Sequence, residues 1–189
     1  MWRPRLGGLN FKRLSAEERE GLETEFSGEE VWRAVCSCDG NKAPSPDDLT
    51  LSFIQAIWEV IRDDCLRFMS EFHKDITVVK EINKTFIALV PKCGKLKSMK
   101  DFRPISLVRC MYKVLAKVLA NRVKSVMNTI IGDYQMAFVK DRQILDNIVI
   151  AEEIVHKWKR DKVGGILLKL DFEKAYDSVD HNFLLDMMT

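Results

Sequence analysis

The sequence is poor in the features that mark disulfide-rich, zinc-binding and membrane proteins. Its 189 residues include only five cysteines, an odd number without a CxxC pair, and three histidines far apart in the chain. This argues against a disulfide framework, a zinc site and a histidine-based triad. The opening segment MWRPRLGGLN lacks the apolar stretch of a signal peptide, and no apolar run approaches the ~20 residues of a membrane helix. We therefore expect a soluble, intracellular protein with reduced cysteines and no membrane contact.

The sequence also lacks a strong excess of one charge. Thirty lysines and arginines stand against 28 aspartates and glutamates, a net charge of +2, so composition alone does not predict a polyanionic partner. The distribution is uneven, because the segment 92–113 contains one acidic residue, Asp101, and these basic residues: Lys92, Lys95, Lys97, Lys100, Arg103, Arg109 and Lys113. With 47% hydrophobic residues the chain can bury a core, so we expect a globular domain with one basic segment.

The first part of the chain predicts helices around one loop. Residues 1–26 are polar and are expected to be an irregular lead-in segment. Ser27, three residues before Glu30, predicts a capping box that starts a short helix, and the Pro- and Asp-rich residues 38–48 predict a loop. One helix of about five turns is then predicted by helical spacing of the apolar residues Ile54, Ile57, Trp58, Ile61, Cys65, Phe68, Met69 and Phe72.

The second part predicts long helices and two short strands. Residues 85–90, TFIALV, predict the first strand. Helical spacing predicts a helix with the apolar face Val108, Tyr112, Leu115, Leu119, Val123, Val126 and Ile130. A further helix is expected to turn inward Leu145, Ile148, Ala151, Val155 and Trp158. Gly164 and Gly165 then permit a reversal into a strand over 166–171, and the whole pattern predicts an α+β fold.

Asp171 follows this last apolar strand, in the stretch LLKLDFEKAYDSVD. An aspartate in such a place usually caps a turn or the next helix. It can also bind a metal ion, because carboxylates on rigid elements hold the divalent ions that assist phosphoryl transfer. Asp171 alone does not decide between these two interpretations.

Four stretches, in order, resemble the reverse transcriptases of LINE-type non-LTR retrotransposons, most closely those of plant elements. They are NKAPSPDDLTLSFIQAIWEVI, FIALVPKCGKLKSMKDFRPISLVRCMYKVLAKVLANRV, YQMAFVKDRQILDNIVIAEEIV and LLKLDFEKAYDSVDHNFL, the last resembling the first catalytic motif. The resemblance covers essentially the whole chain. It implies the fingers and the start of the palm of a right-hand polymerase: a lead-in segment over 1–26, a fingers-like region over 27–160 and the start of the palm over 161–189.

The resemblance also implies roles for individual residues. Asp171 matches the metal-binding aspartate, with the backbone carbonyl of Phe172 as a further ligand, and Mg²⁺ prefers such oxygen ligands. Tyr176 matches the residue that crowds the sugar 2′ position, although core packing explains it equally well. Lys92 and Arg103 match the pair that contacts the incoming triphosphate, and lysine and arginine are suited to phosphate oxygens.

A further block implied by the resemblance lies near the template strand and nucleotide. Gln135, Phe138 and Arg142 match its positions, although a buried Phe138 in the core is an equally good interpretation. Three lysines lie on the polar face of the predicted helix whose apolar face runs from Val108 to Ile130. Contact with backbone phosphates and simple solvation both account for Lys113, Lys117 and Lys124.

The sequence departs from the family in two ways. The second catalytic motif, a pair of aspartates, does not occur in it, so we expect a truncated polypeptide that does not polymerise alone. Ser45, Asp48 and Asp141 stand where the family has glycines, and each would strain the chain by ~1 kcal/mol if its φ were positive. Both departures suggest a decayed element copy or one exon of a larger gene.

The predicted function is thus a fragment of an RNA-directed DNA polymerase. The parent enzyme would use an RNA template, a DNA primer, deoxynucleoside triphosphates and Mg²⁺, and would work in the nucleus. The alternatives are a non-catalytic nucleic-acid-binding remnant that uses its basic fingers surface, and an inert product with an exposed apolar face.

Overall fold

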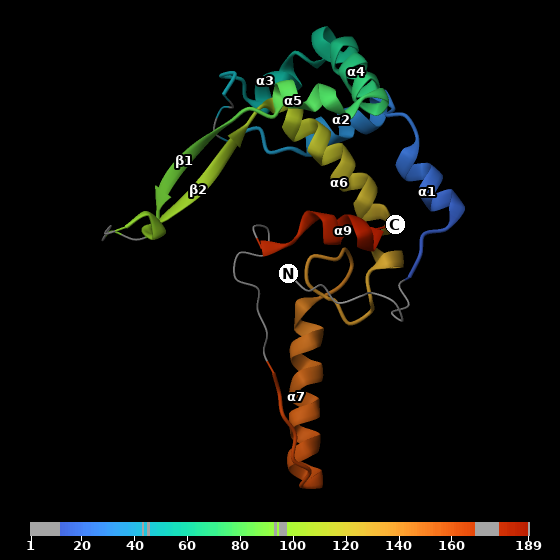
Figure 1. Cartoon of the computed structure of the whole chain (residues 1–189), viewed down its shortest axis with the longest axis vertical. Helices are drawn as coiled ribbons and strands as arrows, with labels where there is room; N and C mark the ends of the chain where they lie inside the picture. Colours follow the sequence, from blue (N-terminus) through green and yellow to red (C-terminus); the bar gives the residue numbers. More distant parts are fainter. Residues whose placement is uncertain are drawn as a thin grey trace. The chain divides into compact units, whose positions relative to one another are not determined.

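The computed structural model describes residues 12–42, 44, 46–92, 94, 98–168 and 178–188 (Figure 1). They fall into two compact units, Met1–Arg142 and Gln143–Thr189. The described residues form helices and one two-stranded sheet, as the predicted α+β class requires. No helix among them is both long enough and apolar enough to cross a bilayer.

The segment expected to be an irregular lead-in contains helix α1, Ala16–Glu23, so that prediction is wrong for these residues. A complete capping box starts the helix. Ser15 Oγ accepts from the backbone N–H of Glu18 at 3.1 Å, and Glu18 Oε2 accepts from the N–H of Ser15 at 2.8 Å. The other carboxylate oxygen of Glu18 accepts from Thr129 Oγ1 at 2.7 Å, which ties α1 to helix α6. The S-x-x-E pattern of this box is visible in the sequence.

The core of the first unit lies between four helices. These are α2 (Gly28–Ser37), α3 (Leu51–Ala56), α4 (Trp58–Lys74) and α6 (Cys110–Ile130), accompanied by the short η1 (Ile76–Val78) and α5 (Val79–Ile82). Trp32 and Trp58 stack with ring centroids 5.0 Å apart. The fully buried side chains at the centre are Val31, Val35, Met69, Cys110, Val114 and Val118. The predicted loop after α2 is confirmed for its described residues.

The helix predicted from Ser52 onward is broken into α3 and α4 at Ile57. This residue has φ −102° and ψ 15°, ends α3 and precedes the first turn of α4. Gln55, just before the break, donates to the carbonyls of Val35 at 2.9 Å and Cys38 at 3.2 Å, which fastens α3 to the end of α2. The predicted apolar stripe is confirmed, because its members are buried or half-buried along both helices.

Strands β1 (Thr85–Pro91) and β2 (Phe102–Val108) form an antiparallel hairpin. Strand β1 confirms the strand predicted over residues 85–90. Strand β2 was not predicted, because Pro104 lies inside it and a proline within an apolar segment argues against a strand. The Lys92 N–H donates to the Asp101 carbonyl at 2.7 Å. Hydrogen-bonded pairs alternate along an antiparallel ladder, so Pro91 and Pro104 fall at positions that bond nothing across the hairpin. The missing N–H groups therefore cost no ladder bond.

Helix α6 begins at Cys110, so the predicted helical start at Val108 is wrong, since β2 includes that residue. Most of its predicted apolar face is buried or half-buried, including Leu115 and Val126, but two predicted members are not. Leu119 and Val123 are 36% and 43% exposed, whereas Val114 and Val118 are buried. Two apolar stripes overlap on this helix, and periodicity alone does not say which of them meets the core.

The second unit contains α7 (Ile144–Asp161) and α9 (His181–Met188). The apolar face predicted for α7 is wrong at its start, because Leu145 and Ile148 are 64% and 57% exposed, and only its later members are half-buried. The strand predicted over 166–171 is absent from its described part, 166–168, which is irregular. A strand requires a partner, and the described residues of this unit offer none.

Gly165 lets the chain pass closely over Trp158 after α7 ends. A Cβ atom at this position would lie 2.5 Å from the indole Cζ3 atom of Trp158. Of the two glycines, only Gly165 is required by this close approach, because a Cβ at Gly164 would meet nothing within 4 Å.

Candidate triphosphate and nucleic-acid interface

The hairpin brings Lys92 and Arg103 onto one face. Val90 pairs with Arg103, and the Lys92 N–H bonds to Asp101, so the side chains of Lys92, Val90 and Arg103 point to the same side. Lys92 and Arg103 are thus diagonal neighbours across the two strands, within reach of one ligand for long side chains. Both are exposed. Two cations 11 positions apart in sequence therefore meet near the turn of the hairpin.

The side chain of Lys92 bonds to a described residue just before β2. Lys92 Nζ donates to the carbonyl of Lys100 at 2.7 Å, and Asp101 Oδ2 accepts from the Ser98 N–H at 2.8 Å in a capping box that starts η2, Met99–Asp101. An ammonium has three donors, so Lys92 retains two for another ligand. The Arg103 guanidinium makes no hydrogen bond or ion pair with any residue that the structure describes.

Gln135 and Arg142 meet in the loop that follows α6. Arg142 donates to three backbone carbonyls, those of Gly132 at 2.6 Å, Gln135 at 2.8 Å and Ile131 at 3.2 Å. Gln135 Nε2 donates to the carbonyl of Ala137 at 3.0 Å. These contacts make Arg142 a residue that positions the loop, because much of its guanidinium is already occupied. Proximity of the loop to template or nucleotide stays a prediction.

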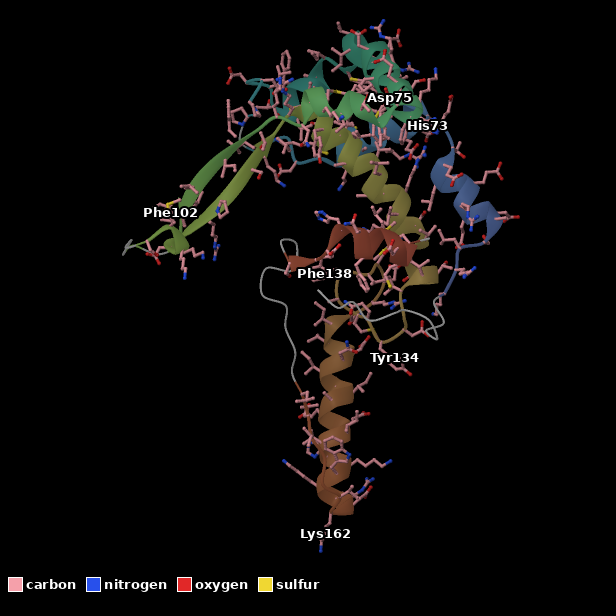
Figure 2. The ribbon with its side chains drawn as sticks, viewed as in Figure 1. His73, Asp75, Phe102, Tyr134, Phe138 and Lys162 are labelled. Atoms are coloured by element: carbon pink, nitrogen blue, oxygen red, sulfur yellow. The ribbon has the colours of Figure 1, made fainter. Side chains whose placement is uncertain are left out.

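Phe138 is 99% exposed on this loop, so the alternative that it serves the core is wrong (Figure 2). Its φ is 65°, a left-handed conformation that is rare and strained for a bulky residue. Tyr134, on the same loop, is 92% exposed. Strained, exposed residues are concentrated at binding sites, which favours a functional interpretation of Phe138.

Two of the three positions where the family has glycines have positive φ, which meets the condition stated for strain: Asp48 at 56° and Asp141 at 65°. The third, Ser45, lies outside the described residues. Aspartate tolerates the left-handed region better than most residues, but glycine adopts it without steric cost.

Replacing Asp141 by glycine should therefore raise the free energy of unfolding by about 0.5–1 kcal/mol. Urea unfolding of the purified chain measures this change. Lys140→Gly is the matched control, because Lys140 is not among the residues with positive φ, and it should not stabilise the protein. A loss of stability in Asp141→Gly would show that the aspartate side chain, and not the backbone strain, dominates at this position.

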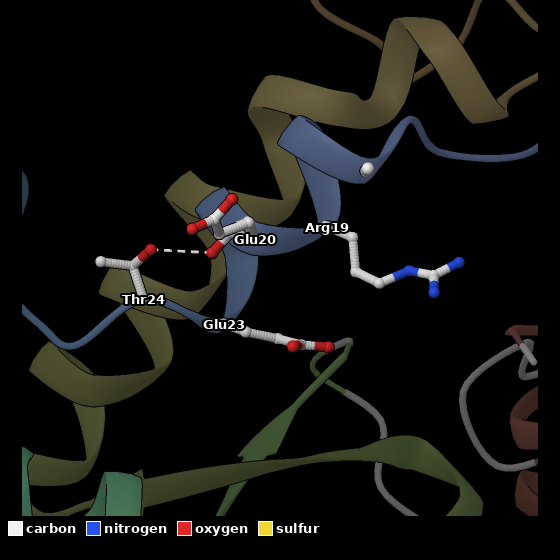
Figure 3. A pocket seen from close by; sticks show the side chains of 5 residues that line it. Arg19, Glu20, Glu23 and Thr24 are labelled. Atoms are coloured by element: carbon white, nitrogen blue, oxygen red, sulfur yellow. Dashed lines mark hydrogen bonds between the residues drawn. The ribbon is translucent and has the colours of Figure 1, made fainter.

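The predicted catalytic residues Asp171, Phe172 and Tyr176 lie outside the described residues, so the predicted Mg²⁺ site stays a prediction. Within the described ranges, no group of three or more His, Cys, Asp and Glu side chains could hold a metal ion. The pocket of Figure 3 lies on α1 and contains none of the predicted site residues; its lining includes Thr24, whose Oγ1 donates to the Glu20 carbonyl at 2.7 Å.

The sequence interpretation singled out Lys113 and Lys117 but missed that Lys42 joins them in a basic cluster around Cys38. Burial raises the pKa of the Cys38 thiol, while the positive charges of Lys117, Lys42 and Lys113 act in the opposite direction. Lys42 comes from the loop after α2 and the other two lysines from α6, so distant parts of the chain converge here. The described cysteines 36, 38, 65 and 110 are free thiols.

Comparison with known proteins identifies similar sequences. Residues 90–189 match the model of the family described as reverse transcriptase (RNA-dependent DNA polymerase). The chain is 34% identical, over 91% of its length, to the uncharacterized 149 kDa protein of transposon TX1 from Xenopus laevis. It is 26% identical, over 89% of its length, to the retrovirus-related Pol polyprotein from type-2 retrotransposable element R2DM of Drosophila melanogaster.

A probable RNA-directed DNA polymerase from transposon BS of Drosophila melanogaster is 24% identical over 83% of this chain. The chain spans only a small part of these relatives: 13% of the TX1 protein, 16% of the R2DM polyprotein and 18% of the BS polymerase.

Proposed function

The chain belongs to the reverse transcriptase family, as part of an RNA-directed DNA polymerase of a non-LTR retroelement, and on this premise we propose that it forms the fingers and the start of the palm of that enzyme. The complete enzyme would copy an RNA template onto a DNA primer with deoxynucleoside triphosphates, in the nucleus. The narrower resemblance to plant elements stays a prediction.

We assign triphosphate binding to Lys92 and Arg103. The observation that supports this most is their common face on the hairpin, with the Arg103 guanidinium unpaired among the described residues and Lys92 bonded once. Lysine supplies a compact charge, and arginine supplies a planar fork that matches two phosphate oxygens. Together they would offset the negative charge of a triphosphate where phosphoryl transfer increases it.

The remaining roles follow the family resemblance. Asp171 and the carbonyl of Phe172 are hard oxygen ligands that fit Mg²⁺, which stabilises negative charge on a transferring phosphoryl group when bound. Tyr176 would exclude ribonucleotides by crowding the sugar. The 189-residue chain alone should give no primer extension, because its sequence contains no second aspartate motif.

Removing either cation of the hairpin should weaken triphosphate binding. Lys92→Ala and Arg103→Ala should each raise the Kd for a fluorescent deoxynucleoside triphosphate by about 5–10-fold, because each loses an exposed charge-assisted hydrogen bond. Arg103→Lys should restore binding only in part, since it lacks the fork. Lys80→Ala is the control, an exposed lysine on α5 that should leave the Kd unchanged. Equal affinity in all four variants would refute the assignment.

The second candidate is a nucleic-acid-binding protein without catalysis. The basic cluster around Cys38 favours it, because that cluster requires no catalytic carboxylate. Binding of an RNA–DNA hybrid, measured against salt concentration, tests this function. Binding that weakens with a smaller salt slope in Lys92→Ala and Arg103→Ala would support it. If the chain does not bind the hybrid at low salt, the remaining alternative is an inert product with an exposed apolar face.

A further inference from the structure

Helix α1 has little of its own to keep it folded. Apart from its capping box, it is a helix of eight residues, none of which is buried. Isolated helices shorter than ~12–15 residues are marginal in water. Gly21 lies inside the helix, where glycine is less favourable than alanine, and a Cβ atom at this position would meet nothing within 4 Å. The helix therefore depends on its contacts with α6.

The face that α1 turns toward α6 has a carboxylate at its centre. Leu14, Glu18 and Leu22 are half-buried at a spacing of four, whereas the other residues from 12 to 25 are exposed. Glu18 Oε1 accepts from Thr129 Oγ1, close to the end of α6, at 2.7 Å. The hydrogen bonds from Thr129 and Ser15 hold the pKa of Glu18 below its ordinary value, so they favour the charged form.

A second link joins the residues before α1 to the residues after α6. Lys12 Nζ lies 2.9 Å from Asp133 Oδ1, with the two side chains 48% and 79% exposed. Exposed ion pairs of this kind contribute little to stability. The bond between Glu18 and Thr129 is therefore the main polar link between α1 and α6 ahead of Leu22.

The segment that follows Gly21 is held by more contacts. Arg122 donates to three of its carbonyls, and His73 Nε2 lies 2.7 Å from a fourth, that of Glu23. The ring of Phe26 packs on that of Phe72, with centroids 6.1 Å apart. One side of α1 thus has a single main polar link and the other side has several.

We propose that α1 is a conformational latch, which folds and unfolds as a unit against α6 while the core between α2, α3, α4 and α6 stays folded (Figure 1). Parts of a protein with few buried contacts commonly open without global unfolding. Release of α1 uncovers Val126, which is 5% exposed and lies between Arg122 and Thr129 on the same face of α6. The latch does not depend on the proposed function.

Hydrogen exchange in the purified 189-residue chain tests the latch. The amides of α1 should exchange at least about 100-fold faster than the slowest amides of α2 and α4, because their opening does not require global unfolding. Thr129→Val, which keeps the shape but removes the donor, should speed exchange in α1 about 3–10-fold, and Gly21→Ala should slow it about 3–5-fold. The matched control is Ser125→Ala, since this hydroxyl bonds within α6, to the Arg122 carbonyl at 2.6 Å.

Three results of this experiment would overturn the latch. If the amides of α1 exchange as slowly as the slowest core amides, α1 opens only when the whole protein unfolds. If they show no protection in the unmodified chain, α1 is not folded against α6. If Thr129→Val and Gly21→Ala change exchange in α1 no more than Ser125→Ala does, the contact with Thr129 does not close the latch.

Thiol alkylation separates release of α1 from fraying within it. In a chain with Val126→Cys, alkylation by iodoacetamide at position 126 should be faster when Thr129→Val is added and slower when Gly21→Ala is added. The exposed Cys36 serves as the internal reference, and its rate should not change. If Thr129→Val speeds exchange in α1 but leaves alkylation at position 126 unchanged, α1 frays without leaving α6 and the latch is wrong.

Discussion

Replacing Arg122 by alanine should lower the free energy of unfolding by about 3–5 kcal/mol, because it removes one partner of a largely buried ion pair. The Arg122 side chain is 10% exposed and that of Glu30 25%. The guanidinium makes two parallel bonds to the Glu30 carboxylate, from Nε to Oε1 at 2.6 Å and from Nη2 to Oε2 at 2.8 Å. This bidentate geometry is the strongest form of the arginine–carboxylate pair.

The same guanidinium also supports the segment between α1 and α2. Nη1 donates to the carbonyls of Leu22, at 3.0 Å, and Thr24, and Nη2 donates to that of Glu25 at 3.1 Å. The guanidinium carbon lies 4.3 Å from the centroid of the Phe26 ring. All five donors of the arginine are therefore used. Its loss would leave a half-buried carboxylate and three carbonyls without this partner.

Urea unfolding followed by far-UV circular dichroism measures the effect. Arg122→Lys should recover only a minor part of the stability, because an ammonium cannot reproduce five planar donors. The control is Arg33→Ala, which breaks the exposed pair with Glu29 at 2.9 Å and should cost less than about 0.5 kcal/mol. A similar small loss in Arg122→Ala would mean that water replaces these contacts and that Arg122 does not hold the helices together.

Arg122 also shows what periodicity can reveal. It lies four residues after Val118 and four before Val126, both buried, so a charge occupies the apolar stripe of α6. An arginine on such a stripe predicts a buried partner, and this signal was present in the sequence. The partner, Glu30, lies 92 residues away and was assigned to the capping box. Ser27 does accept from the Glu30 N–H at 3.1 Å, but the carboxylate bonds Arg122.

Local patterns predicted the features that neighbouring residues determine. The start of α2, the apolar stripe of α3 and α4 and strand β1 all depend on short stretches. Strand β2 was missed because Pro104 is acceptable only once β1 sets the hydrogen-bond register. The exposure of Leu119 and Val123 on α6 and the break at Ile57 depend on partners elsewhere in the fold, which no local pattern specifies.

The candidate site shows the same contrast between features that can be predicted from the sequence and features that depend on residues distant in sequence. Lys92 and Arg103 were predicted from a resemblance, and the register of the hairpin makes them diagonal neighbours, which supports the proposal that they act together. Lys113 and Lys117 were singled out in the sequence, but the approach of Lys42 to the same cysteine, Cys38, was not predicted, because Lys42 lies on a loop distant from α6 in sequence. Convergence of residues that are distant in sequence is a property of the fold.

The largest functional effect is expected at Asp171. In the complete polymerase that contains this segment, Asp171→Asn should lower metal-dependent primer extension on an RNA template by about 10³-fold or more, because an amide would not supply the negative charge with which we propose that Asp171 binds Mg²⁺. Binding of the RNA strand should be unchanged, since we propose that it depends on the basic residues and not on Asp171. Single-turnover extension at saturating primer–template and triphosphate measures the loss.

Asp177→Asn is the matched control for Asp171→Asn. It removes the same charge six positions later, where we expect only a local hydrogen bond, so extension should fall by less than about 10-fold. Asp171→Glu should keep partial activity, because it retains the carboxylate but moves its oxygens relative to the carbonyl of Phe172. If Asp171→Asn and Asp177→Asn lower primer extension equally, the loss comes from removing negative charge near the primer–template, and not from losing a metal ligand. Full activity in Asp171→Asn would instead show that this aspartate caps a turn.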